Sequence, residues 1–213
     1  MKVFHSLGEA ASLRGYALAL GNFDGVHLGH RALFREAARH GPAGAVTFNP
    51  HPGKVLQPEL APKLITLLPR KLELCEEAGL DAAVVQPFSR AFAGTSSEGF
   101  EKALFEGVGA SHVVVGGDFT YGQRRSGTVE SLRVAAAAAG AELHVVPSLT
   151  VDGAVVSSSR IREYLLEGRV GAARTMLGRP FDLDGVVVRG QGRGRGLGFP
   201  TANVDTANEL KPG

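Results

Sequence analysis

The sequence predicts an α/β protein built on a doubly wound, parallel sheet. Short apolar runs alternate with segments of helical periodicity along the first 150 residues or so. The runs are apolar on both faces, as the strands of a parallel sheet covered by helices are. The order βαβαβαβαβ is typical of an open sheet with helices on either side.

Five strands and four intervening helices make up this predicted sheet. The strands are expected at residues 16–23, 44–48, 82–88, 111–117 and 142–148, and the helices at 28–40, 67–79, 96–108 and 129–140. Thr95 and Glu98 have the spacing of a capping box, which predicts that the third helix begins there. Two more helical segments, 158–170 and 171–178, follow the last strand.

The composition of the sequence changes near Pro180, where a stretch rich in β-branched residues and glycine replaces the helical pattern. We therefore expect one domain at residues 1–179 and a second unit at 180–213. The second unit is too short to close a core of its own. Either the rest of that domain lies outside this chain, or the segment packs on the first domain.

The amino-acid composition limits the class of protein, its cellular compartment and its partners. Its 213 residues are 44% hydrophobic and 21% charged, which is ordinary for a soluble protein. The net charge of +2 is too small to produce a strong positive potential that would attract nucleic acid or a membrane surface. Cys75 is the single cysteine, and no stretch has the features of a signal peptide or a membrane span. We expect a cytoplasmic protein with neither a nucleic-acid nor a membrane partner. The oligomeric state is not indicated.

The most informative stretch is GNFDGVHLGH, residues 21–30, where the first strand leads into the first helix. Gly21 and Gly25 allow a tight turn close to a ligand, and the first turn of a helix offers free N–H groups to anions. His27 and His30 lie on one helical face, where each can donate a hydrogen bond and carry positive charge. The stretch predicts a polyphosphate site. The alternatives are two histidines at an ordinary helix start, or a metal site, for which no carboxylate or thiol has obvious ligand spacing.

Polar residues follow other strands as well. Asn49 and His51 come after the second strand, Asp118 and Arg124 after the fourth, and a serine- and arginine-rich stretch, residues 157–162, precedes a late helix. Each has a simpler interpretation, respectively a proline-bounded turn, a solvated loop and helix N-caps.

The stretch RGQGRGRGLGFPTANV, residues 189–204, has the composition of a disordered Gly-Arg linker or an RNA-binding segment. Its flanks are strand-like, and Phe199 is its single aromatic residue. We therefore interpret it as a β-hairpin whose two strands are joined by a glycine-rich loop.

The motif HLGH after a strand resembles the H-x-G-H signature of the nucleotidyltransferase superfamily, and the chain as a whole resembles bacterial bifunctional riboflavin kinase/FAD synthetases. The resemblance continues, in the same order, through TFNPHP (47–52), VVGGDFTYGQRRSGT (114–128), SSSRIR (157–162), LGRPFDLDGVVVRG (177–190) and GRGLGFPTANV (194–204). Three positions depart from the family pattern. Asn49 and Gly117 stand where the family usually has acidic residues, and Ser159 stands where it has threonine.

This resemblance implies a Rossmann-like nucleotidyltransferase domain that transfers AMP from ATP to FMN, giving FAD and pyrophosphate with Mg²⁺. Its catalytic residues would be His27, His30 and Arg160. ATP would contact the two histidines, Arg160 and Gly21, Asn22, Phe23, Asp24, Gly25, Ser157, Ser158 and Ser159, and FMN would contact Asn49, His51, Asp118, Arg124 and Arg162.

For residues 180–213 the resemblance implies the start of a riboflavin kinase β-barrel, which in the complete family members phosphorylates riboflavin with ATP. Gly192 and Gly194 would surround the nucleotide phosphates, and Thr201 and Asn203 would hold Mg²⁺. The carboxylate base of that kinase comes later in the family's barrel than Gly213, so we expect no kinase activity from these residues.

Two alternatives remain open at this stage. One is a nucleotidyltransferase with another phosphorylated acceptor, such as a pantetheine phosphate or nicotinamide mononucleotide. The other is a nucleic-acid-binding module that uses the Gly-Arg segment.

Overall fold

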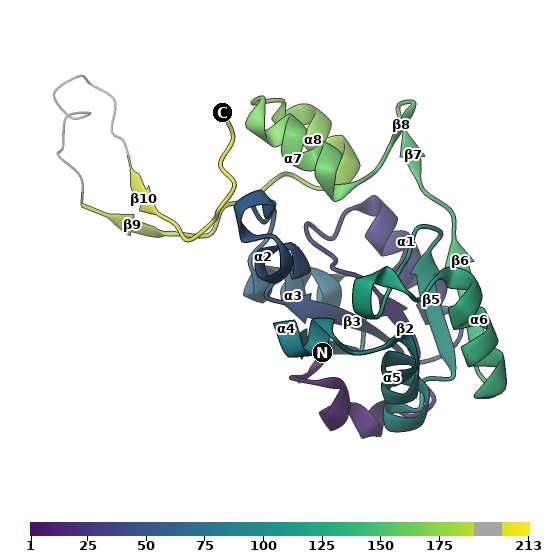
Figure 1. The fold of residues 1–213 in the computed structure, drawn as a ribbon. Helices are drawn as coiled ribbons and strands as arrows, with labels where there is room; N and C mark the ends of the chain where they lie inside the picture. Colours follow the sequence, from purple (N-terminus) through teal and green to yellow (C-terminus); the bar gives the residue numbers. More distant parts are fainter. Residues whose placement is uncertain (190–201) are drawn as a thin grey trace, which may run out of the picture.

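The computed structural model describes residues 1–189 and 202–213, and its centre is a six-stranded parallel sheet (Figure 1). The strand order is β1-β4-β3-β2-β5-β6. The strands are β1 (Lys2–Phe4), β2 (Ala17–Leu20), β3 (Ala43–Asn49), β4 (Ala82–Pro87), β5 (His112–Gly116) and β6 (Glu142–Val146). The chain runs outward from β2 through β3 to β4 and then returns to the other side of β2 with β5. The switch point of this doubly wound sheet therefore lies between β2 and β5.

All five predicted strands are present, so the predicted fold class is confirmed. The prediction missed β1, which pairs in parallel with β4 at the edge of the sheet. This strand is three residues long and largely exposed, so it carries neither an apolar run nor an alternation that a sequence pattern could detect.

Helices cover both faces of the sheet, and β2 shows how its residues are divided between them. Ala17 and Ala19 belong to the cluster that includes Phe34 of α1, whereas Leu18 and Leu20 pack on the opposite side. This alternation follows from the two-residue period of a strand. The helices around the sheet are η1 (Leu7–Leu13), α1 (Leu28–Ala38), α2 (Pro52–Leu56), η2 (Pro58–Leu60), α3 (Leu68–Glu77), α4 (Arg90–Ala93), α5 (Ser97–Lys102), η3 (Ala103–Val108, a π-helix), η4 (Gln123–Arg125) and α6 (Val129–Ala138).

The predicted capping box at Thr95 and Glu98 is wrong by one residue. Ser96 is the N-cap of α5, and its hydroxyl accepts a hydrogen bond from the Gly99 N–H. Serine is as good a cap as threonine, so the spacing alone could not choose between them. A capping box does occur at the start of α6, where Thr128 and Ser131 bond reciprocally.

Two helices, α7 (Ser158–Leu166) and α8 (Val170–Leu177), form a separate layer with its own apolar cluster. The short hairpin of β7 (Thr150–Val151) and β8 (Ala154–Val155) leads into α7. Leu210, near the C-terminus, is fully buried in the same cluster with Ile65 and Ile161. The end of the second unit therefore packs on the first.

The glycine-rich stretch is flanked by an antiparallel pair, β9 (Val186–Val188) and β10 (Asn203–Asp205), which stands away from the helices (Figure 1). This confirms the strand-like flanks of the predicted hairpin. Its valines are exposed, with Val186 at 70% and Val187 at 69%. Gly192, Gly194 and Thr201 lie outside the described residues.

Helices long and apolar enough to cross a bilayer are absent from residues 1–189 and 202–213.

Candidate active site

A cavity of about 1070 Å³ opens at the carboxyl ends of β2 and β5. Leu20, the last residue of β2, and residues 21–24 line one side, and Gly116, the last residue of β5, and residues 118–125 line another. This is the switch point of the sheet, where ligands of doubly wound proteins bind. The volume is at the upper end of the range of about 300–1,000 Å³ for pockets that hold one small ligand.

The two histidines of HLGH stand at the start of α1 on the wall of this cavity. His27 is the N-cap of the helix, and its Nδ1 accepts a hydrogen bond from the His30 N–H at 3.3 Å. Because Nδ1 accepts, the proton of a neutral His27 lies on Nε2. The two rings stack with centroids 3.5 Å apart. Nδ1 of His30 is buried without a hydrogen-bond partner in the described parts of the chain.

Burial makes both imidazoles neutral in the substrate-free protein. It lowers the pKa of His27 to about 4, against a smaller opposing effect of Asp24. It also lowers the pKa of His30, helped by the neighbouring His27 and Lys71. In the substrate-free protein these side chains are therefore neutral hydrogen-bond donors, and the positive charge expected of them beside a polyphosphate stays a prediction.

The loop between β2 and α1 is shaped by its two glycines. A Cβ at Gly21 would come within 2.9 Å of the Phe23 ring, which is buried and contacts His30 edge-on at 5.2 Å. Gly25 has φ +87°, a conformation that glycine adopts without strain. Phe23 therefore supports the histidine from below. Gly25 shapes the loop without lining the cavity, and its predicted contact with ATP stays a prediction.

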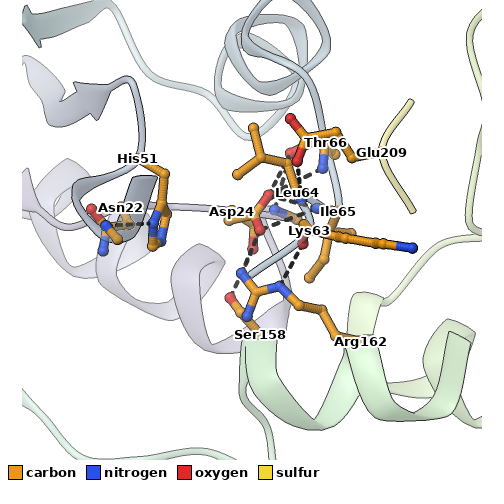
Figure 2. Close-up of polar contacts among 12 residues, drawn as sticks. Asn22, Asp24, His51, Lys63, Leu64, Ile65, Thr66, Ser158, Arg162 and Glu209 are labelled. Carbon is orange, nitrogen blue, oxygen red and sulfur yellow. Dashed lines mark hydrogen bonds and ion pairs between the residues drawn. The ribbon is translucent and has the colours of Figure 1, made fainter. Parts of the chain in front are cut away.

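Asp24 is the centre of a buried polar network (Figure 2). Its carboxylate accepts hydrogen bonds from the N–H groups of Ile65 at 3.0 Å and Thr66 at 3.1 Å. It also pairs with the Arg162 Nη2 at 2.6 Å, and the Arg162 Nε donates to the Lys63 carbonyl. These partners occupy the carboxylate, while Asp24 and Arg162 both also line the cavity, so their predicted contacts with ATP and FMN stay predictions. The pair ties α7 to the loop that carries the histidines.

The serine-rich stretch caps α7 beside the cavity. Ser157 is the N-cap and accepts from the Arg160 N–H, as the capping interpretation expects. Ser158 donates its hydroxyl hydrogen to the Asp24 carbonyl at 2.9 Å (Figure 2), and Ser159 is exposed on the cavity wall. The side chain of Arg160 is exposed and outside the wall, so the structure does not bring this predicted catalytic residue to the site.

The amino ends of α1 and α7 meet at the cavity. A Cβ at Gly29 would lie 3.2 Å from the His27 ring and 3.8 Å from the carbonyl oxygen of Val156, just before α7. Both helices therefore direct unpaired N–H groups and the positive end of their dipoles toward one place. Such a place favours an anion with several phosphates.

Four residues predicted to contact FMN follow other strands, and three of them reach the cavity. His51 lines the cavity and caps α2, accepting from the Gly53 N–H at 3.1 Å. Asp118 and Arg124 are exposed side chains on the wall. Asn49 is exposed and lies outside the wall, and its carbonyl accepts from the Phe88 N–H. Its predicted FMN contact is not supported by this placement.

An aromatic cluster that the sequence analysis missed lines another part of the cavity. Phe48, Phe88 and Phe92 lie with ring centroids 5.8–6.0 Å apart, and Phe119 and Tyr121 follow β5. Flat apolar side chains of this kind accommodate a planar ring system. Phe48 and Phe88, the last residues of the second and third predicted strands, were the available signal.

Lys71 is a second residue that the sequence analysis missed. Its side chain is buried, and its Nζ donates to the Asn22 carbonyl at 2.9 Å, which the Thr47 hydroxyl also contacts at 3.0 Å. Burial lowers the pKa of Lys71, opposed by Asp24. Lys71 holds the backbone of the loop from beneath, and the side chain of Asn22 remains on the cavity wall.

Comparison with known families divides the chain into two matches. Residues 9–160 match the family model described as FAD synthetase, and residues 177–213 match the one described as riboflavin kinase.

Curated relatives cover most of the chain. It is 33% identical to the bifunctional riboflavin kinase/FMN adenylyltransferase of Escherichia coli (strain K12) over 214 residues, which are 98% of this chain and 68% of the relative. It is 38% identical to the protein of the same name from Bacillus subtilis (strain 168) over 198 residues, 90% of this chain and 62% of the relative.

Solved structures agree on the fold. The crystal structure of a macrolide-efflux protein from Streptococcus pneumoniae matches with a TM-score of 0.88 and 29% identity, over 99% of this chain and 70% of that one. Pantothenate synthetase from Thermus thermophilus matches with a TM-score of 0.52 and 19% identity, over 83% and 71%, which shows a shared fold alone. Taken with the family models and the curated relatives, the chain belongs to the bifunctional riboflavin kinase/FMN adenylyltransferase family.

Proposed function

We propose that this chain transfers the AMP group of ATP to FMN, giving FAD and pyrophosphate. One observation carries the proposal. A single cavity has two helix amino ends and a stacked histidine pair in one part, and an aromatic cluster in another. The first part suits a triphosphate and the second suits a flavin ring system.

In this proposal the triphosphate lies between α1 and α7. The Nε2 atoms of His27 and His30 donate hydrogen bonds to its β- and γ-phosphates, and the hydroxyl of Ser159 adds a third donor from the other helix. The backbone of Gly21 and Asn22 lies under the adenylate. Arg160, which the resemblance places on the pyrophosphate, lies outside the cavity wall, so the roles of Ser159 and the α7 amino end replace it here.

To speed this reaction, the protein must hold the two substrates in position and provide a positive electrostatic potential around their phosphates. An oxygen of the FMN phosphate forms a bond to the α-phosphorus of ATP, and the bond from that phosphorus to the bridging oxygen of the β-phosphate breaks, releasing pyrophosphate. Because one anion attacks another, donors that hold both groups and offset their charge lower the barrier. No protein nucleophile is needed.

Magnesium fits this site as an ion carried mainly by the triphosphate. Two aspartates line the described cavity wall, and Asp24 is occupied by N–H donors and Arg162. Asp118 is exposed there and free to share an ion with the phosphates, which is the usual way that proteins bind Mg²⁺. When bound, the ion would offset charge on the phosphate oxygens.

The flavin would lie against Phe48, Phe88 and Phe92, with His51 and Arg124 nearby on the wall for its polar groups. A rigid, planar acceptor makes use of this aromatic surface. A flexible pantetheine phosphate gains less from it, which favours FMN among phosphorylated acceptors.

We further propose the domain division at residue 180, with riboflavin phosphorylation belonging to the second unit in complete family members. In the described part of that unit, β9 and β10 form a two-stranded pair with exposed valines. Asn203, which the resemblance gives to Mg²⁺, is exposed on β10. These residues form no closed barrel around a substrate, so we expect no FMN from riboflavin.

The test is an incubation of the purified chain with ATP, Mg²⁺ and FMN, and separately with riboflavin. FAD and pyrophosphate should form in the first mixture. His30→Ala removes a donor to the leaving group and should lower kcat by roughly 10²–10³-fold. His5→Ala, which changes an exposed histidine, is the matched control and should leave the rate unchanged. Undiminished FAD formation by His30→Ala would refute the assignment.

A further inference from the structure

Three histidines gather at the end of the sheet opposite the proposed active site. His40 lies two residues beyond the last residue of α1, His112 is the first residue of β5, and His144 lies in β6, the edge strand (Figure 1). His112 and His144 are on the same face of the sheet, because His144 is paired with Val114, two residues beyond His112. That face is the one that α1 covers.

The imidazole nitrogens of this cluster lie close enough for side-chain movements to bring them onto one metal ion. One ring nitrogen from each histidine lies within 4.8 Å of the others. Nδ1 of His112 and Nε2 of His144 are 3.1 Å apart. Zn–N bonds of about 2.0–2.1 Å in a tetrahedral site place two nitrogens about 3.4 Å apart, so this pair needs little movement.

The rings of the cluster are partly buried, and a carboxylate contacts one of them. Glu36 bonds to Nε2 of His40 at 3.2 Å. A carboxylate on the second ring nitrogen of a ligating histidine fixes the orientation of that ring.

We propose that His40, His112 and His144 form a binding site for one divalent transition-metal ion of the zinc class, separate from the nucleotide cavity. Imidazole prefers Zn²⁺, Ni²⁺, Cu²⁺ and Co²⁺ over Mg²⁺. The magnesium that accompanies ATP therefore does not compete for the site.

Binding needs one side-chain adjustment. The ring of His40 lies over that of His144 with centroids 3.8 Å apart and an angle of 18° between planes. Nitrogen lone pairs lie in the ring plane, so His40 must tilt before its nitrogen faces the same ion. His40 follows the end of α1 and its side chain is 24% exposed, which leaves it room to do so.

The ion would join α1 to the two strands beside it. Among the described residues the edge strand β6 pairs with β5 alone, and the ion would also connect it to the end of α1 through His40. Because the ligands come together only in the folded chain, binding should raise the melting temperature by mass action.

The test is calorimetric titration of the chelator-treated, tag-free chain with ZnCl₂. We expect one ion per chain and a rise in melting temperature. His112→Ala and His144→Ala should weaken binding by more than the roughly 10–100-fold that loss of an outer-shell partner costs, and Glu36→Gln should fall within that range. Of the three histidine variants, His40→Ala should disturb folding least, because residue 40 lies beyond the end of α1 rather than in a strand.

The controls separate this cluster from other histidines. His5→Ala, and the double variant His27→Asn with His51→Ala in the nucleotide cavity, should bind Zn²⁺ as the unchanged chain does. Far-UV circular dichroism in chelator checks that each variant folds. Absence of Zn²⁺ binding by the folded chain, or binding that survives His40→Ala and His144→Ala but is lost in the cavity variant, would overturn the proposal.

Discussion

His27 shows how a single side chain can serve structure and ligand binding through its two nitrogens. Nδ1 is used by the fold, because it caps α1 through the His30 N–H. Nε2 is left with the proton, which is the arrangement that a phosphate acceptor needs. The cost is burial of an imidazole, which lowers its pKa to about 4.

This burial predicts a dependence of stability on pH. In the unfolded chain His27 takes up a proton near pH 6.5, but in the folded protein only near 4. Between these values the unfolded state binds more protons, so the free energy of unfolding falls as the pH is lowered from 6.5 toward 4. The contribution of His27 is roughly 3 kcal/mol at the lower end. Urea denaturation across this range measures it.

The matched variant is His27→Asn, because asparagine is a good N-cap and does not titrate. It should flatten the pH dependence, whereas His5→Asn, at an exposed position, should not. Equal slopes for the unchanged chain and His27→Asn would contradict the buried neutral imidazole.

At the scale of elements, the site is made by two helices that begin at the same place. α1 follows β2 directly, whereas α7 arrives from more than 100 residues later, after the last strand of the sheet. Gly29 lies between them, and its missing side chain leaves room for the His27 ring, which a Cβ would approach to 3.2 Å. The position of that imidazole therefore depends on one glycine.

Gly29→Ala should lower FAD formation without unfolding the chain. The added Cβ would lie 3.2 Å from two atoms of the His27 ring, so the imidazole must move. A displacement of about 1 Å in a catalytic group can cost about 10²-fold in rate, and the shift needed here is smaller, so we expect a loss of roughly 10-fold or less. Steady-state assays with FMN and ATP provide the measurement.

Gly171→Ala in α8 is the control, because a Cβ there has no atom within 4 Å. It should keep the wild-type rate and gain a little stability from the better helix former. A Gly29→Ala enzyme with the same kcat and KM as the unchanged chain would show that this contact is not needed.

At the scale of the whole molecule, the C-terminal end of the second unit packs against the first unit. Leu210 is fully buried among residues of α7, α8 and the segment at Ile65. Glu209 accepts a hydrogen bond from the Leu64 N–H at 3.0 Å and pairs with Lys54. The hairpin before it, β9 and β10, has few such contacts and exposes its valines. The C-terminal residues thus complete the layer that supports Asp24.

Leu210→Ala should therefore destabilise the nucleotidyltransferase part of the chain. Removing a fully buried leucine side chain costs about 2–5 kcal/mol through lost burial and a cavity. Leu60→Ala, at a leucine that is 78% exposed, should change the free energy of unfolding little. Thermal and urea unfolding compare the two. Similar stabilities would show that the C-terminal segment does not support the first unit.

The parallel sheet could be predicted from the sequence because its strands are apolar on both faces and are separated by periodic helices. β1 could not, because its three residues are stabilised by pairing with β4 rather than by a pattern of their own. The same reason applies to the two-residue strands β7 and β8.

The motif residues His27 and His30 could be placed by their position after a strand. The structural roles of Asp24, Arg162 and Arg160 could not be predicted. Whether Arg160 or Arg162 faces the Asp24 carboxylate depends on how α7 is rotated about its axis. The cluster of His40, His112 and His144 was equally hidden, since 72 and 32 residues separate its members along the chain and only the sheet register joins them.

The ion pair of Asp24 with Arg162 spans 138 positions. A ribosome that makes the chain from its amino end releases the histidine loop long before the guanidinium that anchors it exists. Nascent chains that stop short of residue 162 thus carry the recognisable signature but lack the guanidinium that pairs with its carboxylate. We therefore expect the histidine loop to reach its final arrangement late in synthesis, after α7 has emerged and docked.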